Sequence, residues 1–407
     1  MSSAATPVQP GPDPREAATP AGTPEPGPVA RGLARAGLLR DLDRPQQVFA
    51  YLGPNWFAAV MGTGVVAVAA DSLPYRMPGL RGVADMFWVL AAVLLAALLT
   101  GTAVHWGRHP ATARGHIRHP VLAYYYGAPP MALVTVGTGA LLAGRDLIGL
   151  RVAVDTDWVL WLAGAAMGLL TAVAASYLTL TRPEARDRVP FGGWLMPVVP
   201  PMVSASAGAL LVPYAAPGVT RLVLLACCYA MFGLSLVASA FVISRIVRQV
   251  VAGGAGEPRM IPTLWIVLGP LGQSVTAANL LGSQARLVLP GTRADVLRVA
   301  GLVYGLPVGG FALLWAGAAA AITIATARRH LPFSLTWWSF TFPVGTCVTG
   351  AAELALHTGL VPLRVLAMVF FAALAVAWLT VASRTARDGL RGRLFLPADR
   401  PDANPAS

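Results

Sequence analysis

Lysine is absent from this 407-residue sequence, and charged residues of every kind make up only 12% of it. A soluble chain carries about a quarter of charged residues, so this composition could not cover the surface of a soluble protein of such length. Hydrophobic residues reach 56%, and the mean hydropathy is +0.63. The composition excludes a soluble fold for most of the chain and predicts a polytopic membrane protein.

Cysteine is also scarce, and the common catalytic motifs are missing. Cys227, Cys228 and Cys347 all lie in apolar runs, where neither a disulfide nor a zinc site is expected. The sequence has no Walker motif, no GxSxG and no dinucleotide fingerprint before a helix. We therefore predict no catalytic residue, no metal and no cofactor. The arginines are scattered between apolar runs, so nucleic acid is not an expected partner.

Ten apolar runs of about 20 to 28 residues are each long enough to cross a hydrocarbon layer of about 30 Å. They lie near 52–73, 83–105, 120–143, 157–180, 190–213, 220–246, 261–284, 297–326, 332–356 and 362–383. These runs predict an all-α membrane domain over residues 47–384. Residues 1–46 are Pro-rich and predict a disordered tail, and residues 385–407 predict a short C-terminal tail.

The arginines predict the orientation of the chain. Segments on the side of the two termini hold 20 arginines, and the opposite loops hold 9. Arginine collects on the cytoplasmic side of membranes, so both termini are expected in the cytoplasm. The Ala-, Gly- and Arg-rich composition without lysine suggests a bacterium, and hence its plasma (inner) membrane.

Prolines reveal an internal repeat of about 70 residues. One proline stands at the start of each odd-numbered run: Pro54, Pro120, Pro190, Pro262 and Pro332. Aromatic residues follow each of them, as expected at a membrane interface. The repeat predicts five helical hairpins with quasi-five-fold symmetry.

A second proline lies deeper in four of the odd runs, and a glycine stands at the matching depth in the first. These predicted helix-kink residues are Gly64, Pro130, Pro201, Pro270 and Pro343. Bent helices are tolerated in a membrane where they line a cavity, so the five odd helices are expected to surround one central pore. The even helices are expected outside them.

Small and hydroxylated residues follow each kink and predict the lining of that pore. The predicted pore-lining residues are Thr63, Thr135, Thr138, Ser204, Ser206, Gln273, Ser274, Thr276, Thr346 and Thr349. The alternative is that such residues merely allow close helix packing. That alternative explains less well why they recur in the five odd runs and not in the even ones.

Four segments resemble a known transporter family. In order, the segments are Gly53-Pro54-Asn55-Trp56-Phe57 through Gly64, His119-Pro120 with Tyr124–Tyr126, Gly269–Ser274, and Trp337–Pro343. They resemble the first, third, seventh and ninth helices of the tellurite-resistance/dicarboxylate transporter family. That family includes plant slow anion channels and fungal malate and sulfite carriers. The resemblance spans about residues 48–384. It implies ten helices in five hairpins, a homotrimer in membrane lipid, and transport of small inorganic anions or organic acids.

The resemblance also implies a phenylalanine gate on the ninth helix. The position falls on Phe342, immediately before Pro343, with Phe340 as the second choice. The chain is therefore expected to be an anion channel or transporter, of dicarboxylate, sulfite or tellurite type, and not an enzyme.

Two alternatives use ionisable residues. Glu353 and His357 are spaced i, i+4 on the ninth helix and can share a face, which would suit a proton-coupled C4-dicarboxylate carrier. His105, His109, His116 and His119 have spacings seen in His-rich membrane enzymes. An enzyme of that kind needs more ligands than these, since no carboxylate lies between His105 and His119.

Overall fold

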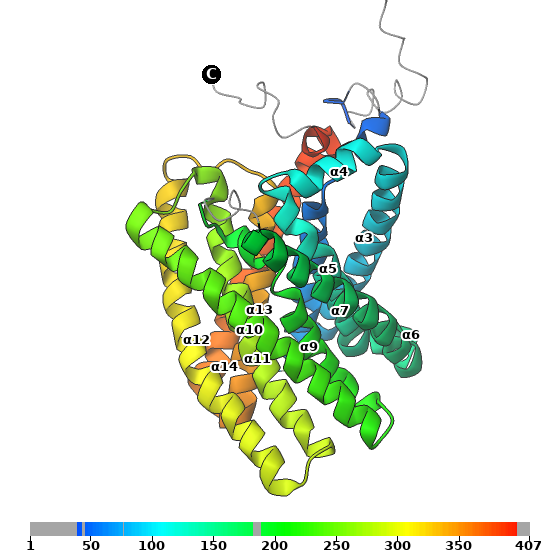
Figure 1. The fold of residues 1–407 in the computed structure, drawn as a ribbon, viewed down its shortest axis with the longest axis vertical. Helices are drawn as coiled ribbons and strands as arrows, with labels where there is room; N and C mark the ends of the chain where they lie inside the picture. The colour runs from blue at the N-terminus through cyan, green and yellow to red at the C-terminus, as the bar shows by residue number, and fades with distance from the viewer. Residues whose placement is uncertain (1–38, 43–44, 76, 182–188, 397–407) are drawn as a thin grey trace, which may run out of the picture.

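The computed structural model describes residues 39–42, 45–75, 77–181 and 189–396, and all regular structure within them is helical (Figure 1). Seven helical stretches of these residues are long and apolar enough to cross a membrane. The prediction of an all-α polytopic membrane protein is therefore confirmed. The count of ten spans stays a prediction, because the α-helical parts of three expected spans are shorter, with 16, 12 and 17 residues.

Each odd-numbered run folds as a short 3₁₀ segment followed by an α-helix. The 3₁₀ segments are η2 (Pro54–Trp56), η3 (Leu122–Gly127), η5 (Gly192–Leu195), η7 (Pro258–Val267) and η9 (Leu335–Phe340). The α-helices that follow are α2 (Phe57–Ser72), α5 (Ala128–Gly139), α9 (Pro200–Leu211), α11 (Leu268–Gln284) and α13 (Phe342–Thr358). We call these five α-helices the inner helices.

The deeper prolines lie at the junction of the two helix types. Pro201 and Pro343 are the second residues of α9 and α13, and Pro130 and Pro270 are the third residues of α5 and α11. In the first turn a missing N–H removes no intrahelical hydrogen bond. These spans are thus interrupted by a change of helix type rather than by a hydrogen bond lost in mid-helix. Gly64 lies inside α2 and does not mark such a junction.

Each inner helix pairs with the long helix that follows it. The outer helices are α3 (Leu80–Arg108), α7 (Leu150–Thr181), α10 (Val219–Gly253), α12 (Gly291–Ala327) and α14 (Val361–Arg391). Inner helices contact one another in the order α2, α5, α9, α11, α13 and back to α2. Each outer helix also touches the inner helix of the next hairpin. The predicted arrangement of five hairpins around one axis is therefore present in the described residues.

Glycines lie where neighbouring members of this ring touch. A Cβ at Gly64, Gly127, Gly192, Gly272 or Gly345 would collide with the adjacent ring element. At Gly272 the obstacle is backbone, because a Cβ there would lie 2.5 Å from the carbonyl carbon of Thr346 on α13. Small residues let membrane helices approach closely. The ring therefore closes on backbone contacts that a larger side chain would prevent.

The outer helices bury only a narrow stripe and leave the rest of their apolar surface open. In α14 the buried residues are Ala367, Leu374 and Val381, which recur every seven residues. Val369, Val376 and Leu379 of the same helix are more than half exposed. In α2, by contrast, nearly every residue is buried. Exposed apolar faces of this extent suit contact with lipid.

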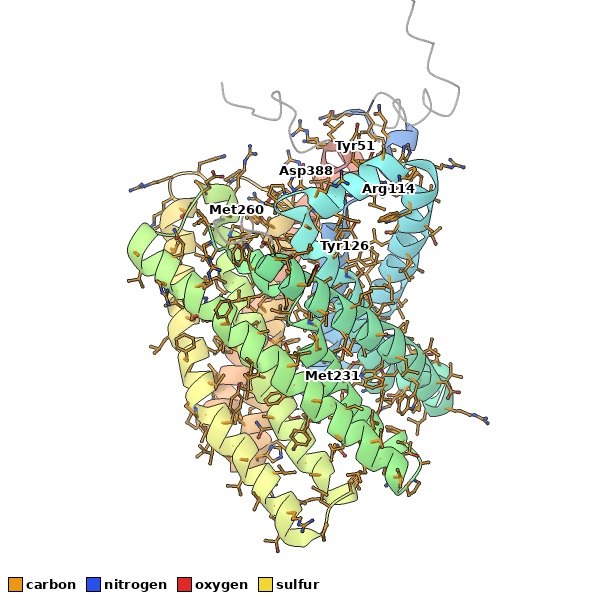
Figure 2. All side chains as sticks on the ribbon, in the orientation of Figure 1. Tyr51, Arg114, Tyr126, Met231, Met260 and Asp388 are labelled. Atoms are coloured by element: carbon orange, nitrogen blue, oxygen red, sulfur yellow. The ribbon has the colours of Figure 1, made fainter. Side chains whose placement is uncertain are left out.

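The two described ends of the chain pack together. The backbone N–H of Leu39 donates to the carbonyl of Leu390 at 2.6 Å, and Arg393 Nε pairs with Asp41 Oδ2 at 2.8 Å. Figure 2 shows Arg114 and Asp388 at this same end of the molecule. Most of the predicted tails lies outside the described residues, while α14 continues to Arg391, beyond the expected boundary at residue 384.

The remaining helical segments connect these elements. They are η1 (Pro45–Phe49), α4 (Pro110–Arg118), the π-helical η4 (Ala140–Gly144), α6 (Arg145–Ile148), η6 (Val212–Tyr214), η8 (Ala285–Leu287) and η10 (Arg393–Phe395).

Candidate functional site

A narrow cavity of about 30 Å³, partly open to solvent, lies where the five 3₁₀ segments meet the five inner helices. All five repeats contribute to its wall. The lining residues are Ala58, Met61, Tyr125, Met131, Met196, Val199, Ile266, Gly269, Pro270, Trp338, Ser339, Phe342 and Pro343. Because the inner helices form a closed ring, we call this space the axial cavity.

The deep end of the axial cavity is apolar. No lining residue on α13 lies beyond Pro343, and none on α11 lies beyond Pro270. Met61, Met131 and Phe342 are the large side chains at this depth, and each is less than 10% exposed. Tyr125 and Ser339 bring hydroxyl groups to the wall nearer the 3₁₀ segments. An apolar constriction of this kind disfavours water and ions.

The structure separates the two phenylalanines considered for the gate. Phe342 begins α13 and lines the axial cavity. Phe340 ends η9 and packs edge-to-face against Trp265 and Trp337, with ring centroids 5.6 Å away in both cases. Between them Thr341 is the boundary residue, with φ −102° and ψ −76°. Phe342, and not Phe340, therefore lines the axial cavity.

Polar side chains cross-link three inner helices one to two turns beyond Phe342. Gln273 of α11 donates to the hydroxyl of Ser206 on α9, and the hydroxyls of Thr276 and Thr349 lie 2.8 Å apart between α11 and α13. The hydroxyl of Thr346 donates to the carbonyl of Pro343 at 2.7 Å and lies near those of Leu268 and Gly269. We call Ser206, Gln273, Thr276, Thr346 and Thr349 the polar collar.

The other predicted pore-lining residues are all buried, in different places. Thr63 faces the outer helix α14, where Trp378 Nε1 donates to its hydroxyl at 3.0 Å. Thr135 packs against Gly64 and donates to the carbonyl of Met131 at 2.7 Å. Ser274 donates to the carbonyl of Leu271, and the hydroxyl of Ser204 has no hydrogen-bond partner among the described residues. Thr138 is buried on α5. The sequence pattern therefore mixes residues of the collar with residues of helix contacts.

The inner helices carry no lysine or arginine, and Glu353 is their one acidic residue besides Asp71 near the end of α2. Arginine enters instead around the 3₁₀ segments. Arg245 lies 5.0 Å from the ring centre of Trp194, and Arg384 lies 4.6 Å from that of Trp337. These are distances for cation–π contacts. Arginine side chains thus lie beside two of the 3₁₀ segments, while the collar is neutral.

Glu353 and His357 do share a face, at the far end of α13 from the cavity. His357 Nδ1 lies 2.8 Å from the carbonyl oxygen of Glu353 and 3.8 Å from its Oε2. Ser283 of α11 bonds to Nε2 of the same ring at 2.8 Å. Glu353 is eleven residues past Phe342, or about 16 Å along the helix. The pair joins α11 to α13 beyond the polar collar.

The four clustered histidines pack against one another and against backbone. His105 Nδ1 lies 2.7 Å from the carbonyl of Phe49, and the His105 ring stacks on that of His116 with centroids 5.2 Å apart. Burial lowers the pKa of His116, and the nearby His105 and His119 lower it further. No group of three His, Cys, Asp or Glu in the described residues is placed to hold a metal.

Sequence reasoning missed the buried carboxyl of Asp157. The expected span begins at residue 157, but α7 begins at Leu150, so Asp157 lies two turns inside the helix. The charged residues Arg151 and Asp155 suggested a loop before residue 157. In the structure both are exposed residues of α7 itself. The apolar residues between those two charges were the feature of the sequence that could have indicated an earlier start of the helix.

A ring of inner helices around an axial cavity, wrapped by lipid-facing helices, defines a membrane channel or transporter. Residues 51–386 match the family model described as "Voltage-dependent anion channel". Over 349 residues the chain is 28% identical to the sulfite efflux pump of Arthroderma otae, covering 84% of this chain and 92% of that protein.

Two further relatives come from other lineages. An uncharacterized transporter of Methanocaldococcus jannaschii is 29% identical over 302 residues, which are 73% of this chain and 82% of that one. The malic acid transport protein of Schizosaccharomyces pombe is 20% identical over 367 residues, covering 86% of this chain and 81% of that one. The chain belongs to the voltage-dependent anion channel family and is a multi-pass membrane protein that transports anions.

Proposed function

We propose that small anions cross the membrane along the axis of the inner ring, through the axial cavity, past Phe342 and through the polar collar. The observation that carries this proposal is the cavity itself. All five repeats line it, and it lies directly above the collar on three of the same helices. A path on the axis of a closed helical ring is shielded from lipid at every level.

Helix ends supply the preference for negative charge in this proposal. The five inner helices all begin at the axial cavity, and the aligned peptide dipoles of a helix place partial positive charge at its N-terminal end. That charge is smaller here than at a free helix end, because preceding 3₁₀ turns accept some of the first N–H groups. Arginines near the entrance add to that field at longer range. A neutral collar then favours an anion that loses its bound water easily. Such a collar does not trap the anion as a positively charged side chain would.

The collar offers a small number of donors to an anion. Most of its hydroxyls donate to carbonyls of their own helix, as Ser206 does to Val203 and Thr276 does to Gly272. The Gln273 amide has two N–H donors, and its bond to Ser206 uses one of them. Gln273 is therefore the principal donor in the proposed path, with the other collar residues Ser206, Thr276, Thr346 and Thr349 as its neutral surroundings.

The relatives support sulfite and carboxylic acids as the first anions to test, since two of them are named for sulfite efflux and malic acid transport. Purified protein in proteoliposomes is expected to carry sulfite, malate or chloride faster than empty vesicles do, and to exclude potassium. Nitrate and tellurite complete the panel. Equal permeation of potassium and anions would contradict the proposed role of the helix N-termini, and the absence of any flux would contradict the function.

The carrier alternative uses Glu353 and His357 as a proton-coupling pair. It is favoured by one observation, the partly buried contact that joins these residues to Ser283 across α11 and α13. In that case Glu353→Gln removes the part of malate uptake that a pH gradient drives. Uptake is measured with and without an imposed gradient. An unchanged gradient response in the variant would exclude coupling through this residue.

We further propose that the protein is a homotrimer in a bacterial plasma membrane, with both termini in the cytoplasm and no enzymatic activity. The arginine bias and the packing of Leu39 on Leu390 support termini on one side. In a variant without the native cysteines, Leu360→Cys is expected to react with an impermeant thiol reagent on intact cells, whereas Val251→Cys is shielded. The reverse pattern would overturn the orientation.

A further inference from the structure

Asp157 is a fully buried carboxyl group with no partner in the described part of the chain. Its exposed fraction is 0%, and neither Oδ1 nor Oδ2 has a hydrogen-bond partner. No described arginine or histidine forms an ion pair with it. Polar groups at such depth are normally satisfied, so this side chain requires an explanation other than packing.

Asp157 faces an inner helix beside the proposed path. A Cβ at Gly137 of α5 would lie 2.6 Å from Asp157 Oδ1 and 3.3 Å from its Cα. Gly137 stands between Thr135 and Thr138 on α5. Further along α7, Gly164 packs on Val134 and Gly168 packs on Pro200. One face of α7 therefore runs along α5 and α9, and Asp157 occupies the α5 end of that contact.

The part of α5 next to Asp157 is irregular. The helix ends at Gly139 and continues as the π-helical η4, which also contacts α7. π-helical turns are rare and occur frequently at functional sites, because they loosen the regular hydrogen-bond ladder. The helix that Asp157 contacts can therefore change its local geometry more readily than a continuous α-helix.

The elements packed on this part of α7 provide no charge that could neutralise a carboxylate. α5, η4 and α9 contain no Asp, Glu, His or Arg. In α6, Arg145 and Asp146 are exposed and lie 3.9 Å from each other. Tyr124–Tyr126 of η3 lie at the opposite end of α5, and Arg151 and Asp155 of α7 itself are exposed.

An ionised carboxylate in such a place is strongly unfavourable, because it has lost water and gained neither a donor nor a cation. The packing in this structure therefore fits the neutral acid. Losing the proton requires water to enter between α7 and α5, or the two helices to separate. Since α5 is an inner helix and its Met131 lines the axial cavity, either change alters the wall of the proposed path.

We propose that Asp157 is a proton-binding site that controls conduction. With the proton bound, α7 packs on α5 as observed and flux is low. When the proton leaves to solvent, the carboxylate draws water to the α5–α7 contact and flux rises. The effect on flux rests on the proposed function. The binding of a proton by Asp157 does not.

Flux in proteoliposomes across a pH series tests the effect. The wild type is expected to conduct several-fold faster at alkaline than at acidic pH. Asp157→Asn, which is neutral at every pH, is expected to stay at the low level throughout. Asp155→Asn, two residues away on the exposed side of the same helix, serves as the control and keeps the wild-type response. A wild-type pH response in folded Asp157→Asn would overturn the proposal.

Infrared spectroscopy tests the protonation without transport. Glu353→Gln protein is expected to retain a protonated-carboxyl band at neutral pH, which disappears at alkaline pH and is missing from the double variant with Asp157→Asn. The absence of that band in Glu353→Gln overturns the proposal even if Asp157→Asn fails to fold. Sodium-dependent loss of the band at fixed pH would also overturn it, by assigning the site to a metal cation. A band without any wild-type anion flux would leave the proton site standing and refute the proposed function.

Discussion

Phe342→Ala is expected to increase anion flux by about tenfold or more, the change produced by lowering a barrier by about 1.4 kcal/mol. The phenyl ring lies at the apolar deep end of the axial cavity, next to the polar collar. Its removal widens the apolar part of the proposed path and lowers the cost of wetting it. Rotation of one ring about its side-chain bonds is a small motion, so the wild type can open without rearranging the helices.

Phe340→Ala is the matched control for this prediction. The two residues are separated by one position, but Phe340 packs between Trp265 and Trp337 away from the cavity. Its truncation is expected to lower stability without increasing flux, by less than the roughly 3–5 kcal/mol lost on truncating a fully buried Phe, because Phe340 is only partly buried. If Phe342→Ala lowers the folded yield and does not raise flux, Phe342 is a packing residue and the gate proposal fails.

Gly272→Ala is expected to destabilise the ring at the contact between α11 and α13. The added Cβ would lie 2.5, 2.6 and 2.7 Å from the carbonyl carbon and oxygen of Thr346 and the nitrogen of Cys347. These are backbone atoms, so no rotamer change relieves the overlap, and α11 must move away from α13. Overpacking of this kind costs about 1–3 kcal/mol.

The measurement is the midpoint of thermal unfolding in detergent, together with anion flux. Gly317→Ala is the control, because a Cβ at Gly317 of α12 would meet no atom within 4 Å. Gly272→Ala is expected to lower the midpoint and to change flux, since separating the two helices breaks the contact between Thr276 and Thr349. Equal midpoints for both variants would contradict the view that the ring closes on backbone contacts.

The architecture could be predicted because its causes recur in the sequence. Five prolines at intervals of about 70 residues marked the starts of the inner spans, and the aromatic residues after them marked the interface. Apolar composition supplied the outer helices, whose lipid-facing sides need no pattern beyond hydrophobicity. Because consecutive helices are joined by short connections, the simplest arrangement pairs each inner helix with the outer helix that follows it. The helix contacts agree with this arrangement.

The direction of individual side chains could not be predicted in the same way. A 3₁₀ helix has 3.0 residues per turn and an α-helix has 3.6, so a junction between them shifts the face that each later residue presents. The position of that junction at Thr341 turns Phe342 toward the axial cavity and Phe340 away from it. For the same reason Thr63 and Gln273 look equivalent in the sequence, although Thr63 faces α14.

Burial of charge depended on how far a helix extends. Hydropathy marks where lipid contacts a helix, and not where the helix begins. Because α7 starts seven residues before the expected span, Asp157 lies at the buried contact with Gly137 and not at the membrane interface, where the expected span would have placed it. Glu353 was recognised because it lies well inside its run.

Thiol blockade at Ser339 tests the axial path most directly. Ser339 lines the axial cavity, whereas Leu314 of α12 is 74% exposed on the outer surface. In protein whose native cysteines have been replaced, Ser339→Cys is expected to lose anion flux when an impermeant thiol reagent reacts with it, and high concentrations of the transported anion should slow the reaction. Leu314→Cys should keep its flux under the same treatment. Complete labelling of Ser339→Cys with undiminished flux would show that anions do not cross through this cavity.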